Sequence, residues 1–209
     1  MKMSRVIVLA LLALGSVGAL TMVSHDAEAG PAGMSPEKRA PLKAVLDIER
    51  ESMAAWITAF HDALGAHAAL GANTQTNWDA ANTANNEAET LYQNHQLRKA
   101  YIQFRAAQWK LRPSMDSTSK IPNPPSLITN QLSQENDRLQ RRIDAVTTLI
   151  STYGTAEGKA DYQMSKDKLA ASRASFAANK FAECYANLAI ALDKFDEAIM
   201  STWPESEGE

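Results

Sequence analysis

One stretch of this chain occurs twice, and that repeat is the strongest constraint on its fold. Residues 92–111 and residues 176–195 align without a gap at a shift of 84 positions. The shift pairs aromatic with aromatic and small with small residues: Tyr92 with Phe176, Ala100 with Cys184, Tyr101 with Tyr185, and Ala107 with Ala191. Because both copies must bury the same kind of apolar face, we expect two similar halves.

Each copy has the pattern of a helix, a short turn and a second helix. In the first copy the apolar positions are 97, 100, 101, 104, 107 and 111. Spacings of three and four place these residues on one face of a helix. Asn94 and His95 precede that helix, as Asn179 and Lys180 do in the second copy, and Asn side chains compete for backbone hydrogen bonds. We therefore expect a bend at each of these two places.

Small residues lie seven positions apart on each apolar face, so that two helices can approach closely there. Together with the aromatic residues around them, they give the repeat a pattern that resembles the second half of a tetratricopeptide repeat. His95 and Asn179 stand where that family has a turn glycine, the closing proline is absent, and 84 residues separate the copies, against a family period of about 34. The resemblance implies the hairpin geometry and a recognition scaffold, and not a continuous solenoid.

Residues 1–29 have the three parts of a secretory signal peptide. Two basic residues precede an uncharged apolar run at 6–20, and Ala27 and Ala29 occupy the positions that a signal peptidase reads. We expect cleavage before Gly30, a periplasmic or secreted location, and no membrane span in the mature chain. The alternative is an uncleaved N-terminal anchor, because residues 6–23 form a stretch of 18 residues, which is just long enough to cross a bilayer.

Residues 30–209 are long enough for a single all-α domain with its own core. The repeat divides this domain into halves at 35–112 and 126–203. Residues 113–125 contain four prolines, which remove backbone donors and favour turns. This segment is predicted to be an extended linker between two halves that share one helical bundle.

Capping and stop residues predict the helix boundaries. A Ser or Thr before a helix accepts hydrogen bonds from its first backbone N–H groups. The predicted boundaries are a first helix from Ser35 and Pro36 to Leu70, a second from Thr76 with Asp79 completing a variant capping box, a third at 126–153, and a fourth capped by Thr155.

The sequence offers little support for catalysis or for a bound metal. His61 and His67 are six positions apart, which places them on different sides of a helix, unlike the i, i+4 pair that chelates zinc. A metal site completed by His95 is the weaker alternative. Carboxylates such as Asp193 and Asp196 are expected to be solvated on helix faces. We therefore expect that the protein is not an enzyme and that it binds neither a cofactor nor a metal.

The charge argues against a nucleic-acid-binding protein, and the cysteine content excludes a fold held by internal disulfides. The net charge is −3, and no basic stripe indicates a nucleic-acid partner. Cys184 is the only cysteine, so an internal disulfide cannot hold the fold. Because Cys184 aligns with Ala100, we expect a small buried residue rather than a reactive thiolate.

Aromatic side chains in the first half are candidate contacts for a partner. Trp56, Tyr101 and Trp109 cluster there in sequence, and exposed aromatics are typical anchors at protein interfaces. The alternative is that they fill the core. If they are exposed, they predict a protein or peptide partner in the cell envelope.

The helix predicted at 126–153 also has the pattern of a coiled-coil seam. Asn136 and Ile143 occupy a positions and Leu139 a d position of a heptad, an arrangement that favours two-stranded coiled coils. It predicts a possible homodimer, and the alternative is that the seam faces the protein's own helices.

Taken together, these patterns predict an exported helical interaction protein. The alternatives are a self-associating coiled-coil structural protein, and a carrier that holds a small ligand or metal in the bundle interior.

Overall fold

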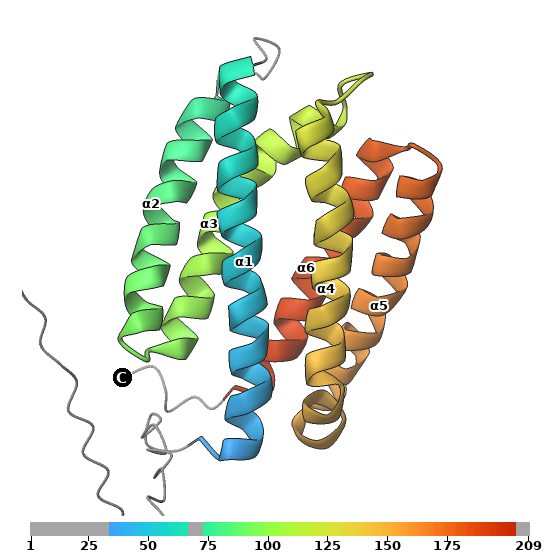
Figure 1. The fold of residues 1–209 in the computed structure, drawn as a ribbon. Helices are drawn as coiled ribbons and strands as arrows, with labels where there is room; N and C mark the ends of the chain where they lie inside the picture. The colour runs from blue at the N-terminus through green and yellow to red at the C-terminus, as the bar shows by residue number, and fades with distance from the viewer. Residues whose placement is uncertain (1–33, 67–72, 204–209) are drawn as a thin grey trace, which may run out of the picture.

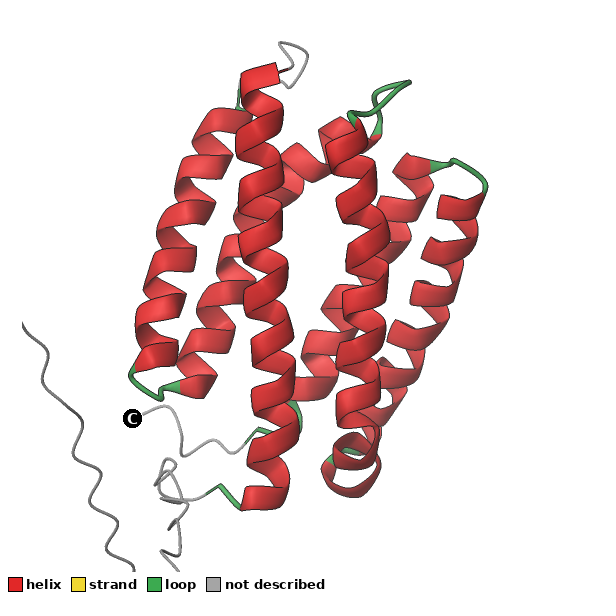
Figure 2. Ribbon diagram, viewed as in Figure 1, coloured by secondary structure: helices red, strands yellow, loops and turns green. Residues whose placement is uncertain are grey.

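The computed structural model describes residues 34–66 and 73–203. All regular structure in these two segments is helical (Figure 2). The helices are α1 (Pro36–Ala66), α2 (Thr74–Gln93), α3 (Leu97–Ser119), α4 (Ser126–Tyr153), α5 (Ala156–Ala177) and α6 (Phe181–Met200). Within the described segments, no helix is both long enough and apolar enough to cross a lipid bilayer.

The helices form two three-helix halves that share one core. Helices α1, α2 and α3 contact one another, as do α4, α5 and α6, and the halves meet where α1 packs on α4 and α3 packs on α6. In Figure 1, α1 and α4 cross the front, α2 and α5 lie at the sides, and α3 and α6 lie behind. The predicted all-α bundle of two similar helix-hairpin halves is confirmed.

The helices that join the halves run antiparallel. Near the start of α1, Glu37 accepts a hydrogen bond from Tyr153 at the end of α4 (3.3 Å). Further along α1, Glu51 pairs with Arg141, which lies earlier in α4 (3.0 Å). The chain directions are visible as opposed colour gradients in Figure 1.

Contacts between the halves occur in pairs that the internal repeat relates. The Tyr101 hydroxyl donates to Asp196 Oδ1 (2.6 Å), and the Tyr185 hydroxyl donates to the backbone oxygen of Arg112 (3.3 Å). The shift of 84 residues that takes Tyr101 to Tyr185 also takes Arg112 to Asp196. Each half therefore presents the same position to the other, as a two-fold arrangement requires.

The two hairpin turns share one backbone geometry. His95 and Asn179 both adopt a positive φ, of 58° and 57°, the left-handed region that favours glycine. In each turn three N–H groups bond back to the preceding helix, among them His95 to Tyr92 (3.0 Å) and Asn179 to Phe176 (2.9 Å). Both predicted bends are confirmed.

Several predicted boundaries are confirmed and one is wrong. Helix α4 has the predicted bounds, α1 begins at Pro36, and Thr155 caps α5 by accepting a hydrogen bond from the Gly158 N–H (3.0 Å). The predicted capping box of α2 is wrong, because α2 begins at Thr74 and Asp79 instead accepts from Gln75 (3.0 Å). The predicted end of the first helix, at Leu70, lies outside the described residues.

The predicted linker at 113–125 is also wrong over its first part. Helix α3 continues through Pro113 to Ser119, and only residues 120–125 connect α3 to α4. A proline inside a helix costs about 3 kcal/mol, but the continued turn buries Met115 and Thr118. A hydrogen bond that Asn77 of α2 donates to Ser114 (2.9 Å) also holds this last part of α3 in place.

Candidate functional site

A network of buried charges lies at the centre of the molecule, between α1 and α4. Arg142 is 0% exposed, as are Glu49 and Glu135. The guanidinium pairs with Glu49 through Nη1 (2.6 Å) and with Glu135 through Nη2. Ser52 and Trp56 donate hydrogen bonds to the second Glu135 oxygen. Each buried charge therefore faces an opposite charge, which burial requires.

The network continues from this centre to α3 and α6. Arg105 of α3 lies 3.7 Å from Glu49 through Nη1, and it pairs with Asp196 of α6 through Nη2. Two turns later in α3, Arg112 donates to Asp193 through Nη1 (3.0 Å). The four helices that form the interface between the halves are thus connected by one set of ion pairs.

Burial and these partners shift the pKa values of two carboxyl groups in opposite directions. Burial alone would raise the pKa of Glu135, but the charges of Arg142 and Arg138 and the hydrogen bond from Ser52 outweigh it, so the pKa is lowered. Burial raises the pKa of Asp196 to about 7, although Arg105 opposes the change. The pKa of Asp196 is therefore raised toward neutral pH, because burial disfavours its charged form.

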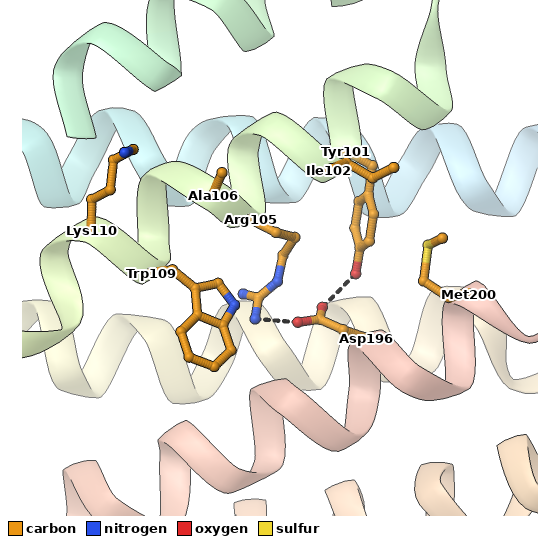
Figure 3. A pocket seen from close by; sticks show the side chains of 8 residues that line it. All are labelled: Tyr101, Ile102, Arg105, Ala106, Trp109, Lys110, Asp196 and Met200. Carbon is orange, nitrogen blue, oxygen red and sulfur yellow. Dashed lines mark hydrogen bonds and ion pairs between the residues drawn. The ribbon is translucent and has the colours of Figure 1, made fainter. Parts of the chain in front are cut away.

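A pocket of about 630 Å³ opens beside the α3–α6 end of the network. Its lining is mostly apolar and includes Tyr101, Ile102, Ala106, Trp109 and Met200. Figure 3 shows the polar part of the lining, where Asp196 accepts a hydrogen bond from Tyr101 and forms an ion pair with Arg105. Lys110 lies on the side away from Met200. We call this space the α3–α6 pocket.

Large apolar side chains are exposed in and around the α3–α6 pocket. Trp109 is 54% exposed and Ile102 is 44% exposed, both in the lining, and Ile190 on α6 is 41% exposed. The guanidinium of Arg112 lies 3.8 Å from the centre of the Trp109 ring and covers one part of it. The indole is thus held in place while much of it faces solvent.

The internal repeat does not account for this pocket. The shift of 84 residues takes Ile102 to Ala186, Arg105 to Ala189 and Trp109 to Asp193. At the equivalent place in the second half, Arg112 pairs with Asp193 and no indole is present. Ile102, Arg105 and Trp109 therefore have no counterpart of similar size in the second half, and the repeated fold does not need them.

Of the three predicted partner contacts, only Trp109 is exposed. Tyr101 also lines the pocket, from beneath, but it is 1% exposed and belongs to the core. The prediction for Trp56 is wrong, because its side chain is 0% exposed and its indole N–H donates to Glu135 (3.3 Å). The ring also stacks on Phe60, with 5.8 Å between centroids. Trp56 completes the core.

The predicted coiled-coil seam lies inside the protein. Leu139 is 0% exposed, Ile143 is 1% exposed and Asn136 is 3% exposed. The Asn136 amide donates to the Leu132 carbonyl oxygen (2.8 Å) and lies 3.8 Å from the sulfur of Cys184. The prediction that this seam joins two copies is wrong, because the protein's own helices already cover it.

The remaining candidates do not form a metal site among the described residues. The His61 ring packs against Trp78, with 5.3 Å between centroids, His95 forms a turn, and His67 lies outside the described residues. Cys184 is buried as predicted. Burial raises the pKa of its thiol, and the hydrogen bonds that the sulfur forms with Ser172 and Asn136 oppose the change.

The sequence did contain a signal for the buried network. Glu49 lies between Leu46 and Met53 in the apolar stripe of α1, and Glu135 and Arg142 interrupt the stripe of α4 in the same way. Charges inside an apolar stripe are unfavourable unless they are paired, so acids and bases at such positions indicate partners. Asp196 is paired in the same way, with Arg105. The prediction that Asp196 is solvated is wrong, because its side chain is only 18% exposed.

Comparison with known proteins gives no independent assignment for this site. The chain matches no protein-family model, no curated protein and no solved structure.

Proposed function

We propose that this protein is an exported binding protein that anchors an envelope protein or peptide on its α3–α6 pocket. The observation that carries the proposal is the Trp109 indole, which is 54% exposed beside a pocket of about 630 Å³. Tryptophan at the centre of an apolar patch is the residue type that contributes most often to binding energy at interfaces.

Two further observations support this proposal. Ile102 and Trp109 both line the pocket and are both exposed, and apolar surfaces with polar surroundings are typical of interaction sites. The equivalent positions of the second half are Ala186 and Asp193, so the duplicated fold does not explain these two side chains. The proposal assigns binding rather than catalysis to this surface.

The location and the scaffold are parts of the same proposal. The signal peptide at 1–29 supports export to the periplasm or beyond. The two hairpins, with their shared left-handed turns at His95 and Asn179, support a tetratricopeptide-like recognition scaffold. Function inferred from a scaffold is an analogy, so the proposal depends on the pocket and not on the scaffold.

The test is capture of the partner after brief crosslinking in cells, with variants that separate the pocket from the rest of the surface. We expect wild-type protein to recover one partner in stoichiometric yield and Trp109→Ala to lose it. Tyr153→Ala is the matched control, because Tyr153 is 41% exposed but lies at the end of α4, outside the pocket lining. Equal recovery by both variants would contradict the proposal.

A further inference from the structure

The outward side of α3 combines exposed apolar side chains with positive charges. Residues that follow one another at steps of three and four share one side of a helix. The residues that share this side are Arg98, Lys99, Ile102, Ala106, Trp109 and Lys110. Lys99 and Lys110 are both exposed, and the apolar residues of this side lie between them in the sequence. We call this surface the α3 face.

The protein does not neutralise the three cations of the α3 face. The other two basic residues of α3 pair with acids of α6. Arg98, Lys99 and Lys110 form no ion pair with any residue that the structure describes. Glu87 of α2 contacts α3, but it accepts a hydrogen bond from Gln103 instead (2.6 Å). The positive charge of this face is therefore left for an acid from outside the described chain.

The equivalent surface of the second half has no such surplus of positive charge. The shift of 84 residues takes Lys110 to Lys194, which pairs with Asp161 (3.1 Å). The same shift takes Lys99 to Glu183, which reverses the charge. A single exposed lysine is ordinary for a protein surface. Unpaired lysines on both sides of exposed apolar residues, in one half alone, indicate a binding surface.

We propose that the α3 face binds an acidic segment of the partner polypeptide, which inserts a large apolar side chain into the α3–α6 pocket. This inference rests on the proposed function and names the chemistry of the partner. The apolar side chain lies against Trp109 and Ile102, and the acids beside it face Lys99 and Lys110. Complementary charges of this kind speed association and select among partners.

The pocket favours a polypeptide over a lipid surface. An anionic bilayer also offers negative charge beside apolar groups, but its surface is flat. The exposed apolar side chains of α3 instead line a hollow of about 630 Å³ (Figure 3), within the range of roughly 300–1,000 Å³ that is typical of ligand pockets. A side chain that projects from a polypeptide can fill this hollow.

The positions of the lysines set the length of the bound segment. Lys99 and Lys110 are eleven residues apart, which is about 16 Å along a helix that rises 1.5 Å per residue. An extended segment covers this distance in about five residues. Acids two or three positions to either side of one apolar anchor can therefore reach both lysines, and a peptide of ten residues is long enough to test the inference.

The experiment selects binders from a displayed library of ten-residue peptides with a fixed central Leu, Phe or Trp and random flanks. We expect the flanks of the binders to be enriched in Asp and Glu. Affinities for the mature protein are then measured by fluorescence anisotropy. Replacing the acids by Asn and Gln should weaken binding by about two- to thirtyfold, the range for two exposed ion pairs. Raising NaCl from about 0.05 M to about 0.5 M should weaken the acidic peptide and not its neutral version.

Variants of the protein assign this effect to the α3 face. Lys99→Gln and Lys110→Gln should each weaken the acidic peptide several-fold and leave its neutral version unchanged. Lys159→Gln removes the same charge from an exposed site on α5 and should change neither affinity. Trp109→Ala should weaken both peptides, because it removes the contact with the apolar anchor.

Other outcomes would overturn the inference. Equal affinities of the acidic and neutral peptides, with binding lost in Trp109→Ala, would reject an acidic partner and leave the proposed function intact. A library without acidic binders would reject it even if crosslinking shows a Trp109-dependent partner. Binding to vesicles of phosphatidylcholine and phosphatidylglycerol that Lys110→Gln weakens, without any selected peptide, would replace the polypeptide by a lipid surface. Failure of both the library and the Trp109-dependent capture would reject the proposed function as well.

Discussion

At the scale of single residues, Arg142 is the side chain on which the buried network depends. Its guanidinium lies between Glu49 and Glu135, and all three side chains are fully buried. Arg142→Met would leave two carboxylates without their principal counter-charge in a medium that solvates them poorly. We expect the free energy of unfolding to fall by about 3–5 kcal/mol, measured by urea denaturation at pH 7.

Arg141 provides the matched control for this prediction. It is the next residue in α4, its side chain is 51% exposed, and it pairs with Glu51 at 3.0 Å. An exposed pair contributes about 0.2–1 kcal/mol, so Arg141→Met should change stability little. Similar losses for the two variants would contradict the role given to the buried network.

The members of the buried network could be predicted only in part. A charged residue in an apolar stripe indicates that it has a partner, but not which residue that partner is. Glu49 and Glu135 occupy core positions of their helices, which indicates burial and pairing. Their common partner, Arg142, is far from Glu49 in sequence and is brought to it by the packing of α1 on α4. The exposure of Trp109 and the burial of Trp56 depend on the same packing.

At the scale of helices, small residues set how closely neighbouring helices approach. Ala107 of α3 and Ala191 of α6 are 0% exposed, and Ser165 of α5 donates to the backbone oxygen of Ala191 (2.7 Å). Ala107→Trp or Ala191→Trp would overpack these contacts. We expect each to cost about 1–3 kcal/mol, seen as a lower thermal midpoint.

Ala182 tests whether that cost comes from the packing. It lies at the start of α6 and is exposed, so Ala182→Trp should stay within about 0.5 kcal/mol of wild type. Unchanged midpoints for Ala107→Trp and Ala191→Trp would show that these residues do not set the helix spacing.

Helix boundaries were predictable where local chemistry decides them. The Thr155 cap of α5 and the bends at His95 and Asn179 depend on residues within one turn. The continuation of α3 through Pro113 was not predictable in this way. A local rule ends the helix there, whereas burial of Met115 and Thr118 by the rest of the molecule favours its continuation.

At the scale of the whole molecule, the internal repeat predicts two halves but not how they meet. Tandem stacking and a two-fold arrangement can bury the same apolar faces, so the sequence leaves both open. The paired contacts of Tyr101 with Asp196 and of Tyr185 with Arg112 show the two-fold arrangement. In this arrangement α3 and α6 lie together and form the pocket, which neither half contains alone.

This arrangement predicts that the connection between the halves is not needed to hold them together. A protease site inserted between Pro122 and Asn123 would cut the segment that joins α3 to α4. The fragments should co-elute and unfold in one transition, because the buried ion pairs of Arg142 and Arg105 join helices of both halves. As a control, the chain is cut in denaturant and the mixed fragments are refolded, which tests whether the halves associate when they were not already folded together before cleavage. Separation of the cut fragments at micromolar concentration would contradict the shared core, and it would also remove the pocket, since α3 and α6 would no longer meet.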